Sequence, residues 1–105
     1  MVHHVALDKL RPDVTPEIVE EMIRKTRSLL LKIPEVLSVR SGKKIEPNME
    51  WPFFVSLDFE SRHKQAMFRD DPVYLKFLEE VVRAHTTEQL LLDYETDPGR
   101  NVKYS

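Results

Sequence analysis

Two short stretches of this chain carry most of the side chains that could bind an ion or move a proton. The first, FRDDPVYLKF at residues 68–77, places Asp70 and Asp71 directly before Pro72 and Tyr74. The acidic pair is either a cation site or a break between two helices. We prefer the break, because a residue before proline is disfavoured in helical geometry and an aspartate caps a helix well. Tyr74 can donate a hydrogen bond, but a phenol is a poor base near neutral pH.

The second stretch is VHHVALDKL at residues 2–10, which holds His3, His4 and Asp8. Side chains alternate between the two faces of a strand, so His4 and Asp8 share one face and His3 lies on the other. His3 and His4 therefore cannot hold one metal ion together, and His63 and His85 have no metal-ligand spacing. We expect no metal and no cofactor.

A basic run, RSGKK at residues 40–44, has two interpretations. It is either an attraction site for phosphate or the solvated end of a strand and its loop. The second interpretation is preferred, because charged runs at strand ends are commonly solvated.

The charge balance and the missing cysteines argue against several classes of function. The formal net charge is −2, so we expect no basic face for nucleic acid or for an anionic membrane. Without cysteine there are no disulfides, zinc–thiolate sites, iron–sulfur clusters or thiol nucleophiles. The first residues do not resemble a signal peptide, and no segment approaches the ~20 apolar residues of a membrane-spanning helix. We expect a cytoplasmic protein.

The elements that must position these side chains follow from hydrophobic periodicity. Alternating apolar residues predict strands over 2–10, 36–41, 51–59 and 88–95. Thr15 and Pro16 begin a long helix that Pro34 ends, and Ser61 caps a short helix through Phe68. A last helix runs from Pro72 to about His85.

The predicted order is therefore β-α-β-β-α-β, which is typical of an α+β, ferredoxin-like domain. This arrangement has one four-stranded antiparallel sheet with the helices on one face. The length of 105 residues fits one domain. We assign residues 1–95 to that domain and residues 96–105 to a polar C-terminal tail.

Helices on one face leave the other face of the sheet bare, and that face is not polar. Val5, Leu7 and Phe54 point outward if their strand neighbours face the helices, and Leu90–Leu92 place leucine on both faces. Burial of each such side chain contributes about 1.5–3 kcal/mol. A two-fold dimer, sheet against sheet, is the favoured solution. The alternative is a monomer with a few exposed apolar side chains.

Four stretches, taken in order, resemble the stress-responsive α/β-barrel (Dabb) domain family of the dimeric α+β barrel superfamily. HHVALDKLRPDVTPE is similar to the family's His-led first strand and helix cap, and IPEVLSVRSGKKI to its helix end, strand and glycine. FRDDPVYLKF resembles the segment that commonly holds His-Pro-x-His, and LLLDYE the last strand. The likeness spans about residues 2–95. It implies a homodimer whose two sheets close into a barrel, in a family that includes stress-induced proteins, ring-forming oligomers and plant polyketide cyclases.

Cyclase members of that family use a tyrosine on the short helix and the second histidine of His-Pro-x-His as an acid–base pair. Matched segment to segment, the tyrosine falls on Phe68, the first histidine on Asp71 and the second on Tyr74. A further pocket histidine falls on Phe53. Phe68 has no proton to give, so the resemblance does not carry cyclisation to this chain, and no catalytic residue is assigned.

The resemblance also matches His4 to the family's first-strand histidine and Asp93 to an acid on its last strand. These strands are neighbours in the expected topology, so the two residues can pair, and Asp8 shares the face of His4. A carboxylate raises the pKa of a neighbouring histidine and holds its ring in one orientation. The pair is either the polar floor of an apolar pocket beneath Tyr74 or a structural hydrogen bond near the strand ends, and we prefer the structural hydrogen bond.

The sequence thus predicts a Dabb protein that forms a homodimer through its open sheet face and has a small apolar pocket for a hydrophobic or aromatic ligand. The candidate pocket residues are His4, Asp8, Phe53, Phe68, Tyr74 and Asp93. One alternative is a small enzyme that resembles a polyketide cyclase or a cofactor-free monooxygenase and acts on a hydrophobic or aromatic compound. Another is a non-catalytic assembly module.

Overall fold

The computed structural model describes residues 1–97, so most of the expected C-terminal tail, residues 98–105, lies outside the described part of the chain. Its elements are β1 (Val2–Leu10), α1 (Pro16–Leu30), β2 (Val36–Lys43), β3 (Phe53–Phe59), α2 (Arg62–Arg69), α3 (Pro72–Phe77), the π-helical segment η1 (Leu78–Arg83) and β4 (Thr86–Glu95).

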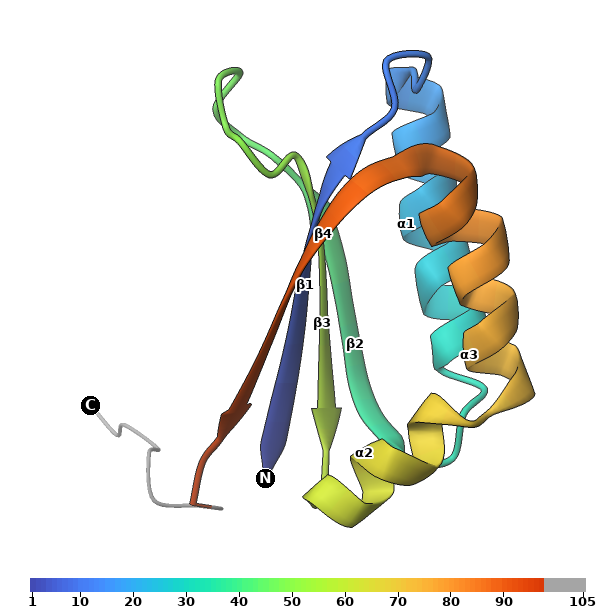
Figure 1. Cartoon of the computed structure of the whole chain (residues 1–105), viewed down its shortest axis with the longest axis vertical. Helices are drawn as coiled ribbons and strands as arrows, with labels where there is room; N and C mark the ends of the chain where they lie inside the picture. Colours follow the sequence, from blue (N-terminus) through green and yellow to red (C-terminus); the bar gives the residue numbers. More distant parts are fainter. Residues whose placement is uncertain (98–105) are drawn as a thin grey trace.

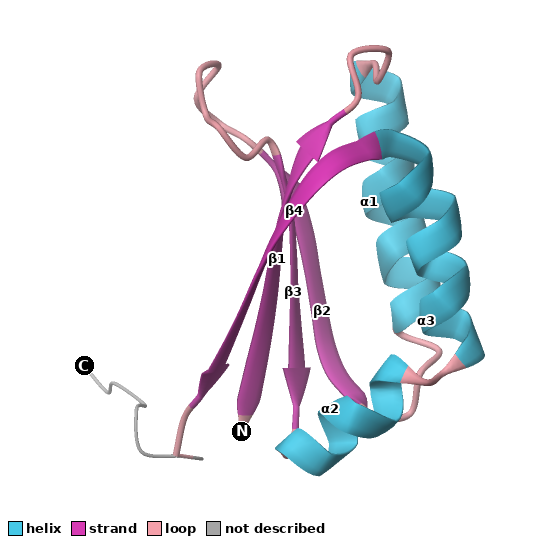
Figure 2. Cartoon of the chain, in the orientation of Figure 1, coloured by secondary structure: helices cyan, strands magenta, loops and turns pink. Residues whose placement is uncertain are grey.

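The four strands form one antiparallel sheet in the order β2-β3-β1-β4. All the helices lie on one side of this sheet, and the other side carries no element of residues 1–97 (Figure 1; Figure 2). The predicted α+β, ferredoxin-like arrangement is therefore confirmed.

The hydrophobic core lies between the sheet and α1, as the alternation of β3 predicts. Phe53, Val55, Leu57 and Phe59 are all buried, and the residues between them are only half-buried. Met22, Leu29 and Leu30 meet them from the helical side. Val2, His4, Ala6 and Asp8 of β1 are buried on the same face of the sheet. The odd-numbered residues of β1 therefore face away from the helices.

Four expected boundaries were wrong by two residues or more. The second strand continues to Lys43 and not to residue 41, and the last strand begins at Thr86 and not at residue 88. The first helix ends at Leu30 and not at Pro34, because backbone hydrogen bonds from Lys32 and Ile33 close tight turns onto Leu29 and Leu30. The third strand begins at Phe53 and not at Trp51, since Pro52 has no N–H to donate to a sheet ladder. Trp51 is consequently only half-buried, with the Lys9 ammonium 4.9 Å from its ring centre.

The last helical region starts at Pro72 as predicted but changes character at Leu78. It continues as the wider π-helical segment η1, in which Val81 is fully buried. The side chain of Thr86, at the start of β4, bonds the Val82 carbonyl at 2.8 Å. Apolar residues at this spacing fit either helix type, so the sequence contains no signal for the change. Among residues 1–97, no helix has both the length and the apolar character needed to cross a membrane.

The acidic pair at the junction of α2 and α3 is a helix break, as preferred above. The Asp71 carboxylate accepts a hydrogen bond from the Val73 amide at 2.8 Å and caps the N-terminus of α3. Asp70 is the last residue of the α2 turn, and no hydrogen bond of its side chain is found within residues 1–97.

Replacing Asp71→Ala is expected to lower the free energy of unfolding by about 1 kcal/mol, because it removes an N-cap acceptor. Asp70→Ala is the matched control and is expected to change it by less than about 0.5 kcal/mol. Urea unfolding at equal chain concentration measures both. Equal effects from the two substitutions would contradict the capping role.

Candidate functional site

The predicted contact between the first and last strands is present on the helix-facing side of the sheet. His4 of β1 lies directly opposite Asp93 of β4 in the strand register. The Nδ1 atom of His4 is 2.7 Å from Oδ1 of Asp93. The pairing is confirmed, whereas its role in binding stays a prediction.

Two side chains of α2 also contact Asp93, and neither contact was predicted from the sequence. Gln65 Nε2 donates to Asp93 Oδ1 at 2.6 Å, and Arg69 lies 3.9 Å from Oδ2. Burial alone would raise the pKa of the Asp93 carboxyl, but the hydrogen bonds from His4 and Gln65 and the nearby charges bring that pKa below its ordinary value. The sequence does contain one signal for these two contacts: Gln65 and Arg69 are four residues apart, which places them on the same side of α2.

The ionised Asp93 determines the tautomer of His4. A carboxylate only accepts hydrogen bonds, so Nδ1 of His4 must carry the proton that lies between them. In the neutral ring, Nε2 is then an acceptor, and it becomes a donor when the ring is protonated. His4 is 8% exposed, so its ring presents this nitrogen in a largely water-free environment.

Aromatic rings line the helical side of the same region. Phe68 and Tyr74 have ring centres 4.1 Å apart, and Phe59 and Phe77 extend the row on either side. Burial is the main reason that the pKa of Tyr74 is raised, with Arg69 opposing and the Asp93 and Asp8 carboxylates adding to it. The Tyr74 hydroxyl therefore stays protonated at neutral pH and is a hydrogen-bond donor.

Asp8 is the least satisfied polar group of the region. It is 1% exposed, and its Oδ1 atom has no hydrogen-bond partner within residues 1–97. Burial raises the pKa of Asp8 to about 6, partly offset by a hydrogen bond from Gln89. A buried carboxyl without a full set of partners is destabilising when ionised, and such groups concentrate at functional sites.

The six candidate residues therefore do not have equal standing. His4 and Asp93 pair, Tyr74 is near enough for the charges of Asp93 and Asp8 to act on it, and Phe68 stacks against Tyr74. Phe53 is a core side chain, 1% exposed, and is paired with Asp8 across β1 and β3. The largest hollow that we describe lies elsewhere, and none of the six lines it.

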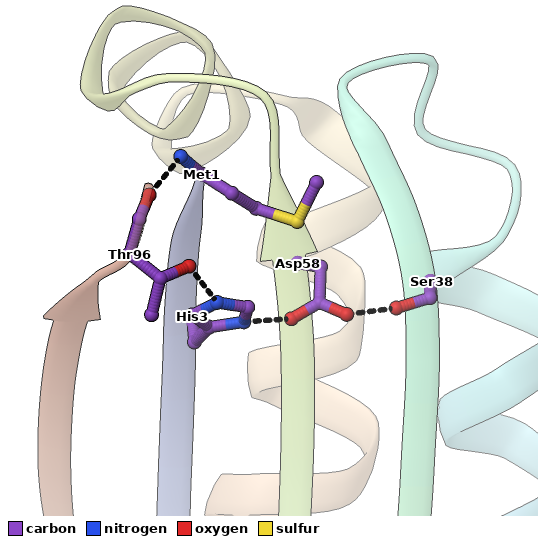
Figure 3. A network of polar contacts seen from close by, with 5 residues as sticks. All are labelled: Met1, His3, Ser38, Asp58 and Thr96. Carbon is purple, nitrogen blue, oxygen red and sulfur yellow. Dashed lines mark hydrogen bonds and ion pairs between the residues drawn. The ribbon is translucent and has the colours of Figure 1, made fainter. Parts of the chain in front are cut away.

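A second polar network, missed by sequence reasoning, lies on the open face of the sheet (Figure 3). His3 Nδ1 is 2.6 Å from Asp58 Oδ1, and His3 Nε2 is 2.7 Å from the Thr96 hydroxyl. Ser38 donates to the other oxygen of Asp58. Burial acts to raise the pKa of Asp58, but the bonds from Ser38 and His3 lower it overall. Only the register of all four strands brings these residues together, so no local pattern could have shown them.

The order of the elements and the single antiparallel sheet with helices on one face define a ferredoxin-like α+β domain. The sequence profile of the family described as "Stress responsive A/B Barrel Domain" (Dabb) matches residues 2–96. The chain belongs to this family, which confirms the resemblance stated above.

Solved structures are similar over nearly the whole chain. A crystal structure of an Arabidopsis thaliana protein is 24% identical, with a TM-score of 0.81, over 92% of this chain and 96% of that one. A dimeric ferredoxin-like protein of unknown function from Thermobifida fusca is 21% identical, with a TM-score of 0.80, over 90% of each chain. A hydroxynitrile lyase from Passiflora edulis is 19% identical, with a TM-score of 0.77, over 92% and 94%. At these identities the likeness shows the fold alone. A comparison with curated proteins finds no significant match.

The raised pKa of Asp8 leads to a pH-dependent stability. The folded chain holds this proton up to about pH 6, whereas the unfolded chain releases it near its ordinary pKa of 3.8, so the contribution of Asp8 to stability falls as the pH rises through this window. Asp8→Asn is expected to stabilise the protein by up to ~3 kcal/mol above pH 6 and by much less near pH 4. Urea unfolding at several pH values and one chain concentration measures the difference.

The matched control is Asp13→Asn in the exposed loop after β1, which is expected to show no such dependence. A gain from Asp8→Asn of the same size at both ends of the pH range would contradict a charge-based cause.

Proposed function

We propose that the chain forms a homodimer through the open face of its sheet and binds a small hydrophobic or aromatic molecule on the helix-facing side. The cytoplasmic location and the separate role of residues 96–105 as a tail remain predictions from the sequence.

The observation that supports the dimer is an apolar row across the open face. Leu7 lies opposite Phe54 on one side and Leu90 on the other, and Val5 lies opposite Leu92. Side chains directly opposite in antiparallel strands share a face, so the row crosses three strands without interruption. Helices of this chain cover only the other face (Figure 1). A second copy covers the row with the same residues, as a two-fold interface requires.

Leu92→Lys is expected to convert the dimer to a monomer, because it places a charge on the apolar face that the two copies would bury. Leu91→Lys is the matched control: it is the next residue of β4, lies opposite Ala6, faces the other side and is 52% exposed. Light scattering measures the mass, for which one chain contributes 12.4 kDa. A wild-type mass of one chain would reject the dimer.

The observation that supports a ligand site is a set of polar groups with free hydrogen-bonding capacity beside a wall of aromatic rings. Asp8 is buried without a partner for Oδ1, His4 is held by Asp93 with Nε2 available, and the Tyr74 hydroxyl is a donor. Phe68 and Tyr74 provide flat apolar contact beside these groups. Apolar walls with a few convergent polar groups are typical of small-molecule sites. An aromatic ligand that carries hydroxyl or carbonyl groups can stack on the aromatic side chains and form hydrogen bonds with the polar groups.

The His4–Asp93 pair also supports a second candidate function, acid–base catalysis on such a compound. An imidazole held by a carboxylate is the usual arrangement of a general base. Phe68 cannot supply the acid of the cyclase pair, and the Tyr74 hydroxyl and the buried Asp8 carboxyl are the proton donors that the region offers. The lyase activity named for the Passiflora edulis neighbour belongs to that protein. The catalytic candidate would be favoured by a compound that the wild type converts, and that His4→Ala binds with the same affinity but does not convert.

Tyr74→Phe is expected to weaken binding of hydroxylated aromatic acids about three- to tenfold, because it removes one hydrogen-bond donor and keeps the ring. Tyr94→Phe, on the opposite face of β4 and 58% exposed, is the matched control with little expected effect. A thermal-shift screen followed by calorimetry measures affinity. If none of these acids binds, or if both variants bind as wild type does, the ligand site is rejected.

A further inference from the structure

A cavity of about 560 Å³ lies at one end of the sheet, apart from the residues considered above. It is open to solvent on one side and is lined by the end of β1, the start of α1 and the loop that joins β2 to β3. This loop and the start of α1 project from the same end of the molecule (Figure 1). The volume is within the range of roughly 300–1,000 Å³ that is usual for small-ligand sites.

The inner wall of the cavity is apolar. Leu10 and Val14 come from the end of β1 and the loop after it, Val19 from α1, and Met49 and Pro52 from the β2–β3 loop. Val19 is 9% exposed and belongs to the hydrophobic core, whereas Met49 is 53% exposed. The apolar wall therefore extends from the hydrophobic core to the solvent-exposed surface. It can contact an aliphatic chain or a flat apolar ring of a ligand.

The rim of the cavity carries three lysines, of which two are paired with carboxylates and one is not. Lys9, Lys43 and Lys44 line it, together with the carboxylate of Glu50. Lys43 is paired with Glu20 of α1, and Lys9 lies 3.1 Å from Glu88 and 3.4 Å from Glu50. Lys44 bonds only the Pro47 carbonyl, at 3.0 Å, and has no carboxylate partner within residues 1–97.

This charge pattern selects one kind of ligand. Lys44 has a positive charge that no acidic side chain of the described residues balances, so a single anionic group is favoured beside it. Glu50 stands at the same rim and disfavours a second negative charge. The basic run RSGKK, taken above as a solvated strand end, supplies two of the three rim lysines.

We propose that this cavity binds a monocarboxylic acid with an apolar body, with the carboxylate at Lys44 and the body on Val14, Val19 and Met49. The site is separate from the His4–Asp93 region and does not depend on the function proposed for it.

Titration of the whole protein with octanoate, followed by calorimetry at low salt and by amide chemical shifts, tests the proposal. Lys44→Gln is expected to weaken octanoate binding about tenfold, because it removes a charge-assisted hydrogen bond. Lys32→Gln, an exposed lysine beyond the far end of α1, is the matched control and leaves affinity unchanged. Val14→Trp fills the cavity and abolishes binding, with thermal unfolding used to verify the fold. Uncharged octanol is expected to bind about tenfold more weakly than octanoate.

In the wild type, octanoate is expected to shift the amides of Val14, Val19 and Met49. Shifts confined to His4 and Asp93, or to Val5 and Leu92 on the open face, would overturn the proposal. So would equal affinities of wild type and Lys44→Gln, or no binding of octanoate at all. A failure of the Tyr74 experiment with aromatic acids leaves these outcomes unaffected, so the two sites are tested separately.

Discussion

The structure depends on one constraint: helices cover a single face of a four-stranded sheet. Every strand must then serve two environments, a core on one side and an open surface on the other. In β3 this produces the alternation of buried Phe53, Val55, Leu57 and Phe59 with half-buried residues between them. The same constraint leaves an apolar row on the open face, which a single chain cannot cover. The proposed self-association and the observed division of polar groups between two faces both follow from this constraint.

The adjacent histidines of β1 illustrate this division. His4 points to the helices, where Asp93, Gln65 and Arg69 form its surroundings. His3 points to the open face and bonds Asp58 and Thr96. Each histidine has its own carboxylate, so one short strand supplies two independent His–Asp pairs. The first lies beside an aromatic wall, and the second lies on the face proposed for the dimer.

The fold was predictable because its signals are local. Alternating residues predicted the strands, and Thr15, Ser61 and Asp71 were correctly expected to cap helices. The misses have physical causes. The end of α1 is set by tight turns that form four residues before Pro34, and the π-helical turn at Leu78 leaves no trace in the spacing of apolar residues. Trp51 was expected to begin the third strand, but Pro52 separates it from the sheet ladder.

The sequence by itself determined the order of elements and the two faces of each strand, since these follow from alternation and capping. The resemblance added the family and matched His4 and Asp93 to neighbouring strands, but only the register of β1 with β4 placed the two residues opposite each other. Tertiary structure alone decided which further groups meet. Gln65 and Arg69 reach Asp93 only when α2 packs beside the sheet, and His3 meets Asp58 only through the register of β1 with β3. The lysine-rimmed cavity likewise forms where a loop, a strand end and a helix start converge. Contacts between distant parts of a chain depend on packing and register, and a one-residue slip in register would separate them.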